Sequence, residues 1–182
     1  MARQVTEIRL AVESDVPAIS RIYNHYVIHS TCTFHLEPEQ ESERLEWLRA
    51  HDQRHPVTVY CEEGEVVGWA SLTRWHPRPA YRDTAEISVY IDHRYHRRGI
   101  GRNLIRDLIA RATENGFHVL IGGACTEQVA SMELQKSLGF VEVARYRETG
   151  RKFGRWLDVA YFQLTLPNQL PSVPDLKKTD PS

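Results

Sequence analysis

A carboxylate and an arginine-rich glycine turn flank one predicted strand. Glu86 lies at the head of the stretch AEISVYI at residues 85–91, and the turn RRGIGR follows at residues 97–102. Glycines at 99 and 101 let a backbone bend tightly with its amides free, and an amphipathic helix pattern continues from this turn. The N-terminus of a helix favours anions, and arginines add charge-assisted donors. The turn is therefore predicted to bind a pyrophosphate.

Other phosphate-binding motifs do not match this turn. A P-loop needs GxxxxGK[ST], which the sequence lacks. A Rossmann fingerprint needs a third glycine, and position 104 is Leu. The structural alternative is a glycine-tightened connection from strand to helix with solvated arginines. The preceding strand, the arginine cluster and the following helix together favour an anion site.

The same residues resemble a family signature. His96-Arg97-Arg98-Gly99-Ile100-Gly101 is similar to the Q/R-x-x-G-x-G/A motif of GNAT-type N-acetyltransferases, with His where the family usually has Gln or Arg. The stretches IYNHYV, TAEISVYI, RRGIGRNLI, SLGF and KFGRWLDV resemble the bacterial phosphinothricin and methionine sulfoximine acetyltransferases. The resemblance implies acetyl-CoA as co-substrate and a homodimer, with the KFGRW element near the active site and the dimer contact.

Glu86 is the candidate base for acetyl transfer. Amines are mostly protonated near pH 7, so a base that acts directly or through water assists the reaction. The sequence alone favours a solvated glutamate at a strand end, whereas the resemblance places the equivalent glutamate beside the substrate amine. If Val89 and Ile91 face the cofactor across this strand, their backbone groups are expected to hold the pantetheine and polarise the thioester carbonyl. The predicted cofactor-binding residues are Val89, Tyr90, Ile91, His96, Arg97, Arg98, Gly99, Ile100, Gly101, Arg102 and Gln128.

The sequence does not identify a proton donor for the leaving thiolate. Many family members have Tyr or His in the helix before LGF, at the position of Gln135, and an amide does not donate a proton. Water, solvent or another residue must then protonate the thiolate. A thiol pKa of about 8.5 makes it a ready leaving group, so a general acid is useful without being essential.

The acceptor pocket is predicted from two loops. Residues 74–84, RWHPRPAYRDT, are rich in arginine, aromatic side chains and proline, and Arg82 resembles the family's arginine near the acceptor. A bidentate arginine could hold a carboxylate, although each arginine here could equally face solvent. The loop STCTFHLE is expected to form the opposite wall. The predicted acceptor-binding residues are Phe34, His76, Arg78, Arg82, Glu86, Ile87 and Ser88.

The whole-chain composition indicates an ordinary globular protein. The chain has 182 residues, 41% of them hydrophobic and 26% charged, with a net charge of −1, so general affinity for nucleic acid or membranes is not expected. Its three widely spaced cysteines favour reduced thiols over disulfides or a metal site. No stretch reaches the ~18 apolar residues of a membrane span, and the N-terminus lacks a signal-peptide core. We expect a cytoplasmic protein.

The order of the predicted elements indicates a mixed sheet with helices on both faces, and the resemblance implies an α/β (α+β by some schemes) GNAT fold with a mixed, mostly antiparallel central sheet. Residues 147–156 are interpreted as a glycine-broken connection. A single domain is expected over residues 1–166, followed by a proline-rich tail at 167–182. Predicted strands cover residues 6–12, 57–63, 65–73, 85–91, 117–124, 140–146 and 157–166, and predicted helices cover 13–30, 39–53, 101–115 and 127–138.

The predicted function is transfer of an acetyl group by direct attack of an amine on acetyl-CoA. The expected acceptor is a small amino-acid-like molecule of the phosphinothricin, methionine sulfoximine or methionine sulfone type. Alternatives are an acetyltransferase for peptide N-termini or polyamines, and a non-catalytic CoA-binding sensor. The arginine-rich loop favours a small acceptor with a negative charge, and Glu86 argues against the sensor.

Overall fold

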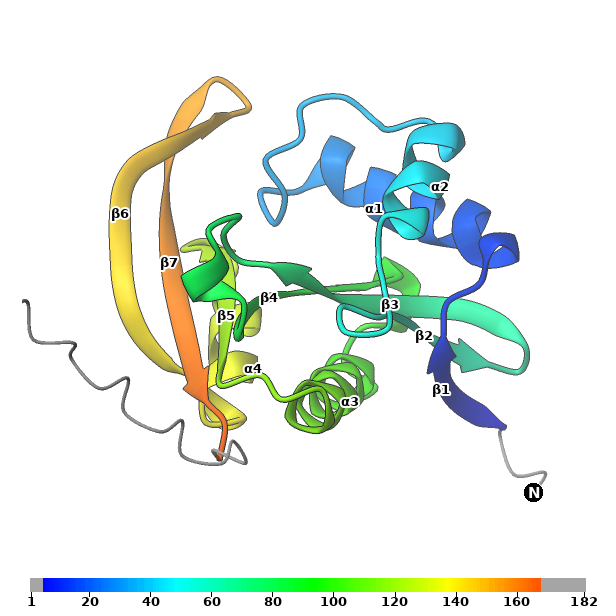
Figure 1. Ribbon diagram of the computed structural model, residues 1–182. Helices are drawn as coiled ribbons and strands as arrows, with labels where there is room; N and C mark the ends of the chain where they lie inside the picture. The colour runs from blue at the N-terminus through cyan, green and yellow to red at the C-terminus, as the bar shows by residue number, and fades with distance from the viewer. Residues whose placement is uncertain (1–4, 168–182) are drawn as a thin grey trace, which may run out of the picture.

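The computed structural model describes residues 5–167, and their strands form one seven-stranded sheet in the order β1-β2-β3-β4-β5-β7-β6 (Figure 1). Neighbouring strands are antiparallel except for β4 and β5, which are parallel. The strands are β1 Thr6–Leu10, β2 Val57–Glu62, β3 Glu65–Arg74, β4 Thr84–Ile91, β5 Val119–Cys125, β6 Val141–Lys152 and β7 Arg155–Thr165. The α-helices are α1 Val16–His29, α2 Glu41–Arg49, α3 Ile100–Glu114 and α4 Val129–Ser137, with 3₁₀ turns at Glu13–Asp15, Pro79–Tyr81 and His93–Tyr95. The predicted fold class is confirmed, while the tail from residue 168 onward lies outside the described residues.

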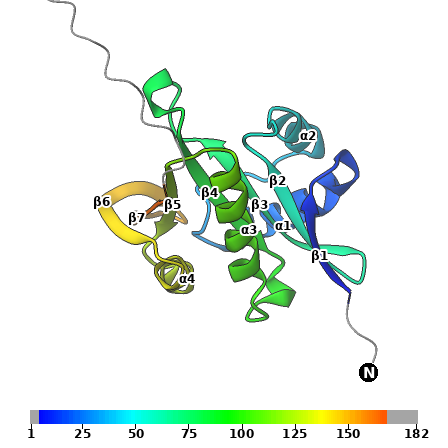
Figure 2. The same cartoon turned by 60° about the horizontal axis from the view of Figure 1, so that its bottom comes forward.

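Helices cover both faces of the sheet, as the sequence predicted. α1 and α2 lie on one face and α3 and α4 on the other (Figure 1). Figure 2 shows α3 lying across β3 and β4, and the buried Leu104 and Leu108 pack into that side of the core. On the opposite face, Ile19 and Ile22 of α1 pack with the fully buried Trp69 of β3. The two layers bury the central strands from both sides, so that β4 and β5 have a fixed position in the middle of the molecule.

The β6–β7 hairpin differs from the sequence prediction. Residues 147–156 do not form a glycine-broken connection: β6 continues to Lys152, and the chain turns at Phe153 and Gly154, which have positive φ angles of 51° and 77°. The irregularity that the glycines suggested is absorbed by a register shift between Tyr146 and Gly150, where Glu148 has a φ of 50°. The prediction was wrong because a bulge keeps a strand running through residues that are poor strand formers.

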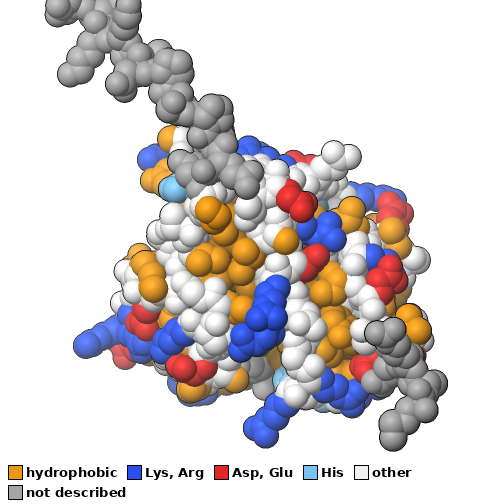
Figure 3. Space-filling view, turned by 90° about the horizontal axis from the view of Figure 1, so that it is seen from below, with side chains coloured by type: hydrophobic (Ala, Val, Ile, Leu, Met, Phe, Trp, Pro, Cys, Tyr) orange, Lys and Arg blue, Asp and Glu red, His pale blue; other side chains and the backbone are white. Residues whose placement is uncertain are grey.

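The surface on the α3 and α4 side of the sheet carries charges of both signs. Figure 3 shows the face formed by α3 and α4, where Lys and Arg side chains are scattered among acidic and apolar ones. Within residues 5–167, no helix has the length and apolar character needed to cross a bilayer. The same residues contain no group of three or more His, Cys, Asp or Glu side chains arranged to hold a metal ion.

Candidate active site

The site lies where the two parallel strands diverge. β4 and β5 pair only over a short stretch, in which Thr84–Glu86 of β4 lies opposite Val119–Ile121 of β5. Beyond these residues β4 stays paired with β3 as far as Ile91, and β5 stays paired with β7 as far as Cys125. The facing edges of β4 and β5 therefore separate, and residues of both strands line a cavity of about 570 Å³.

Alternate residues of β4 direct their peptide groups into this opening. Ile91 of β4 lies opposite Gly68 of β3, and the amide of the next residue, Asp92, donates to the carbonyl of Val67, the residue before Gly68, at 2.8 Å. In an antiparallel ladder this pattern makes Gly68 and Ile91 a non-hydrogen-bonded pair, so the peptide groups of Val89 and Ile87 also point away from β3. The Ile91 carbonyl accepts a hydrogen bond from the Tyr26 hydroxyl. Val89 thus has the backbone orientation that its predicted contact with pantetheine requires.

Tyr90 contributes differently from its neighbours. It pairs with Trp69 in the register of β3 and β4, so its peptide groups face β3 instead of the opening. Its ring stacks on that of Trp69 with centroids 4.8 Å apart, and it also lines the cavity. The backbone of Tyr90 is therefore directed away from the opening, and its side chain forms a wall of the site.

The glycine turn leaves a set of helix amides without intrahelical partners. Gly99 precedes α3 with φ 79° and ψ 0°, a left-handed conformation, and no side chain caps the helix. The first helical bond runs from the Asn103 amide to the Gly99 carbonyl at 3.1 Å. The amides of Ile100, Gly101 and Arg102 therefore precede that bond and are free for an anion. These residues fit the pyrophosphate of acetyl-CoA.

The basic side chains around the turn are at the surface and make few contacts with other side chains. Arg98 lies 3.4 Å from Glu62, with its guanidinium 4.7 Å from the Tyr95 ring centroid. The Arg102 guanidinium donates to the Ser137 hydroxyl at 2.9 Å. His96 Nε2 lies 2.6 Å from the Tyr26 hydroxyl, which places the unusual first residue of the signature beside β4. The structure thus gathers the predicted basic residues around the amides of α3.

The two glycine positions of the signature favour glycine for different physical reasons. A Cβ on Gly99 would meet nothing within 4 Å, so its positive φ is what favours glycine there. A Cβ on Gly101 would lie 2.9 Å from Ile91 Cδ1 and 3.1 Å from Leu134 Cδ2. Gly101 is buried, and its missing side chain lets α3 pack against α4 and β4. The absence of a side chain at Gly101 therefore serves packing, while its backbone amide stays among those free for an anion.

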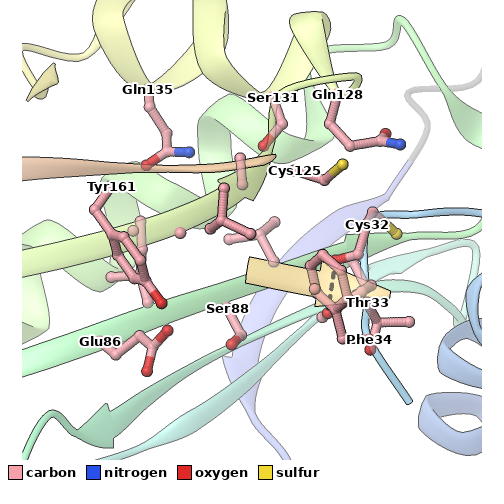
Figure 4. Close-up of a pocket in the computed structure, with 18 of the residues that line it drawn as sticks. Cys32, Thr33, Phe34, Glu86, Ser88, Cys125, Gln128, Ser131, Gln135 and Tyr161 are labelled. Carbon is pink, nitrogen blue, oxygen red and sulfur yellow. Dashed lines mark hydrogen bonds between the residues drawn. The ribbon is translucent and has the colours of Figure 1, made fainter. Parts of the chain in front are cut away.

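Glu86 is the carboxylate of the cavity. It is half-buried in β4, and Figure 4 shows its side chain directed into the cavity near Ser88 and Tyr161. Burial raises the pKa of the Glu86 carboxyl above its ordinary value. Within the described residues the carboxylate forms no hydrogen bond or ion pair. A carboxylate in this state is a stronger base than an exposed one and has free lone pairs for a substrate.

Gln135 is buried on the α4 side of the same cavity. Its side-chain oxygen is buried without a hydrogen-bond partner in the described part of the chain. A Cβ on Gly122 would lie 2.1 Å from that oxygen, so Gly122 makes room for the amide beside β5. Gln128 also lines the cavity, and its Nε2 donates to the Thr31 hydroxyl at 2.9 Å.

Only part of the predicted acceptor set lies together. Phe34, Ile87 and Ser88 line the cavity with Glu86, and Phe34 packs against Gly150 of β6.

His76, Arg78 and Arg82 are not among the residues that line this cavity. The Arg82 side chain is 75% exposed and lies 3.5 Å from Asp83, and the ring of His76 packs at 4.8 Å from Tyr81. Among the described residues that line the cavity, Arg151 is the one with a cationic side chain.

Several wall residues were not predicted from the sequence. Tyr161 of β7 and Gly122 and Gly123 of β5 lie in sequence stretches that match ordinary core strands. The one sequence feature that could have indicated Tyr161 is the alternation of side chains along a strand, which places it on the face opposite the buried Ala160 and Phe162. Their proximity to Glu86 depends on the strand order, which the sequence pattern does not specify.

Comparisons with known proteins agree with this geometry. The profile of the acetyltransferase (GNAT) family matches residues 20–140. The chain belongs to this family. Among curated GNAT relatives, it is similar to the L-amino acid N-acyltransferase MnaT of Escherichia coli K12, with 38% identity over 87% of this chain and 93% of the relative. It is also similar to the L-methionine sulfoximine/L-methionine sulfone acetyltransferase of Salmonella typhimurium LT2, with 39% identity over 87% and 94% of the two chains.

A solved GNAT structure has the same fold. The phosphinothricin acetyltransferase of Sinorhizobium meliloti, in complex with acetyl-CoA, has a TM-score of 0.85 and 32% identity over 88% of each chain. The predicted resemblance to the GNAT family, and to its phosphinothricin and methionine sulfoximine branch, is thereby confirmed.

Proposed function

We propose that this GNAT acetyltransferase moves the acetyl group of acetyl-CoA to the amine of a small amino-acid-like acceptor, of the phosphinothricin, methionine sulfoximine or methionine sulfone type. The observation that carries the proposal is Glu86, a half-buried carboxylate without a protein partner in the cavity between β4 and β5. The relatives named above support the acceptor class. The free amides of α3 and the backbone of Val89 support acetyl-CoA as the co-substrate.

Each part of the site has a role in this reaction. Acetyl-CoA supplies an activated acyl group. The amides at the start of α3 hold its pyrophosphate, and the Val89 peptide group faces the pantetheine path. Glu86 withdraws a proton from the acceptor ammonium, which makes the nitrogen nucleophilic. Gln135 holds no transferable proton, so the thiolate takes its proton from water or from another group.

The cavity argues against the alternative functions. Polyamines carry several cationic groups, whereas Glu86 is the one carboxylate among the described residues that line the cavity. Peptide N-termini need an open groove, and this cavity is bounded by the 30–36 loop on one side and by β6 and β7 on the other. A sensor would not need an unpartnered carboxylate at the cavity wall. Each alternative is an outcome of the acceptor screen.

The acceptor screen compares amino acids with their carboxamides, a peptide N-terminus and spermidine. We expect acetylation of L-methionine sulfone, methionine sulfoximine or phosphinothricin, measured by CoA release. A carboxylate held by an arginine contributes roughly 1.5–3 kcal/mol, or about one to two decades of apparent affinity, which the carboxamide would lose. Arg82→Gln and Arg151→Gln, measured side by side, identify which arginine is responsible. Reaction of only the peptide or spermidine would contradict the acceptor class and leave the acetyl transfer intact.

We further propose that the protein is a cytoplasmic homodimer. The three cysteines are free thiols, which suits a reducing compartment. The β6–β7 hairpin exposes Phe153 and Trp156 to 54% and 59%, which supplies an apolar surface for a second copy.

A further inference from the structure

Tyr161 projects a fixed phenol into the cavity. It pairs with Gly123 across β5 and β7, and a Cβ on Gly123 would lie 3.1 Å from its Cε1 atom, so the ring lies over a bare stretch of backbone. The rings of Trp75 and Tyr146 each contact it edge-on, with centroids 5.7 Å away. A phenol bounded by Gly123, Trp75 and Tyr146 loses little further freedom when its hydroxyl binds a ligand.

The hydroxyl of Tyr161 lies on the same side of the cavity as the Glu86 carboxylate. Figure 4 shows the two groups directed toward one another, with Ser88 beside Glu86. Within residues 5–167, neither the hydroxyl nor the carboxylate hydrogen-bonds to another residue. Burial and the charge of Glu86 raise the pKa of Tyr161, so its hydroxyl stays protonated at neutral pH. Two unsatisfied polar groups therefore face one space inside a partly apolar cavity.

We propose that Tyr161 and Glu86 are the two sides of a subsite for the acceptor amine, with the Tyr161 oxygen accepting one N–H while Glu86 takes another. The inference rests on the proposed function and names the residue that orients its nucleophile. An ammonium group has three donors and no acceptor. The carboxylate and the phenol oxygen satisfy two of them, and the Ser88 hydroxyl, which lines the same cavity two residues along β4 from Glu86, is the candidate acceptor for the third. After the proton has moved to Glu86, the phenol still holds one N–H, which keeps the nitrogen in place.

The subsite would also make the cavity selective for amines. An alcohol or a deaminated acid brings a single donor or none, so filling the cavity with it would bury the oxygens of Tyr161 and Glu86 without partners. An unpaired buried polar group costs as much as the hydrogen bond it replaces. Tyr161 is therefore a substrate-binding residue, distinct from a proton donor to the thiolate.

Binding without reaction provides the direct test. The acceptor, L-methionine sulfone, is titrated by calorimetry into protein saturated with CoA, so that no acetyl group is present. A hydrogen bond to a charged group is worth enough that Tyr161→Phe should weaken acceptor binding roughly tenfold to a hundredfold and leave CoA binding unchanged. Tyr146→Phe is the matched control, because Tyr146 contacts the Tyr161 ring from a 54% exposed position and does not line the cavity.

Each outcome of this test is decisive. Equal acceptor affinity in wild type and Tyr161→Phe overturns the subsite, as does a loss of kcat with unchanged acceptor affinity, which would assign the hydroxyl to proton transfer. If the wild-type protein binds CoA but acetylates none of the amines in the screen, the proposed function fails by itself.

A second measurement does not depend on the folding of the variant. In wild-type protein with its eight tyrosines replaced by 3-fluorotyrosine, one ¹⁹F resonance should move when the amine is added to the CoA complex. It should stay in place when the deaminated acid is added. If none of the eight resonances changes its chemical shift when the amine is added, the subsite is overturned.

Discussion

At the scale of single residues, the proposed reaction depends on the environment of one carboxylate. Glu86 is half-buried and forms no ion pair among the described residues, so burial is what raises its pKa. A raised pKa strengthens Glu86 as a base but also protonates it at a higher pH. The wild-type rate should therefore fall as the pH drops through that pKa. In the proposed reaction Glu86 takes a proton from an amine that enters the cavity as an ammonium.

Replacing Glu86 with Gln should lower kcat on the order of 10²-fold at neutral pH, the usual contribution of a positioned base. The loss should shrink at high pH, where the amine is already neutral, so the rate of the variant should follow the titration of the amine instead of that of Glu86. Acetyl-CoA affinity, measured by calorimetry, should stay nearly unchanged. A loss of the same size at every pH would indicate a positioning role for Glu86 instead.

Linkage provides a control for the stability of this variant. Because the pKa of Glu86 is raised in the folded protein, ionisation of this group lowers stability as the pH rises from its unfolded pKa toward its folded pKa. The uncharged Gln removes that cost above the folded pKa. The unfolding midpoint of Glu86→Gln at neutral pH should therefore equal or exceed that of the wild type.

The sequence identified the residues of this site that lie in local motifs. Glu86, Ser88 and the glycine turn belong to one continuous stretch, so a strand followed by a helix is enough to place them together. Tyr161 is brought to Glu86 by the order β4-β5-β7, which depends on long-range pairing. Arg82 illustrates the opposite case, because composition marked its loop as a binding surface while the direction of its side chain depends on packing.

At the scale of elements, the site is made by strands that separate and a helix that begins with free amides. The divergence of β4 and β5 cannot be inferred from their apolar sequences, because a buried paired strand has the same pattern. The start of α3 could be predicted, since glycine is the residue that adopts φ near 79° at no steric cost. The two strands of the β6–β7 hairpin were predicted, but their extension through residues 147–156 was missed because Gly150 and Gly154 resemble loop residues.

The two glycines of the turn should respond differently to substitution. Gly99→Ala strains a positive φ in open space, and Gly116→Ala does the same at φ 74° beyond the other end of α3, so both should cost about 1–2 kcal/mol of stability. Only Gly99→Ala should also weaken acetyl-CoA binding in calorimetry, and Gly99→Val should abolish it. Unchanged affinity in both Gly99 variants would rule out the pyrophosphate assignment.

Gly101 gives a separate prediction for the packing of α3. A side chain at this position meets Ile91 and Leu134, and overpacking of this kind costs typically 1–3 kcal/mol. Gly101→Val should therefore lower the urea unfolding midpoint, with loss of acetyl-CoA binding as a consequence of the displaced helix. A variant that keeps wild-type stability but loses acetyl-CoA binding would return Gly101 to a direct ligand role.

At the scale of the whole molecule, the β6–β7 hairpin connects the cavity to an exposed apolar surface. The hairpin extends past the sheet beside the loop that follows α1 (Figure 1). Lys152, buried at its end, donates through Nζ to the carbonyls of Ser30 and Thr33 at 2.8 Å each. These residues adjoin Cys32 and Phe34 of the cavity wall. Lys152 therefore links the end of the hairpin to a loop that lines the cavity.

The homodimer proposal predicts that this hairpin is the interface. Light scattering should give the wild-type protein a mass twice the 21.1 kDa of one chain, and Phe153→Glu or Trp156→Glu should return it to 21.1 kDa, because a carboxylate buried in an apolar contact loses its hydration. Val5→Glu is the control, since Val5 is 74% exposed and lies before β1, which is at the opposite edge of the sheet from β6. If Lys152 transmits the contact, the monomeric variants should also show a raised KM for the acceptor while acetyl-CoA affinity is kept. A wild-type mass of 21.1 kDa would contradict the dimer, and hairpin variants that keep the doubled mass would place the interface on another surface.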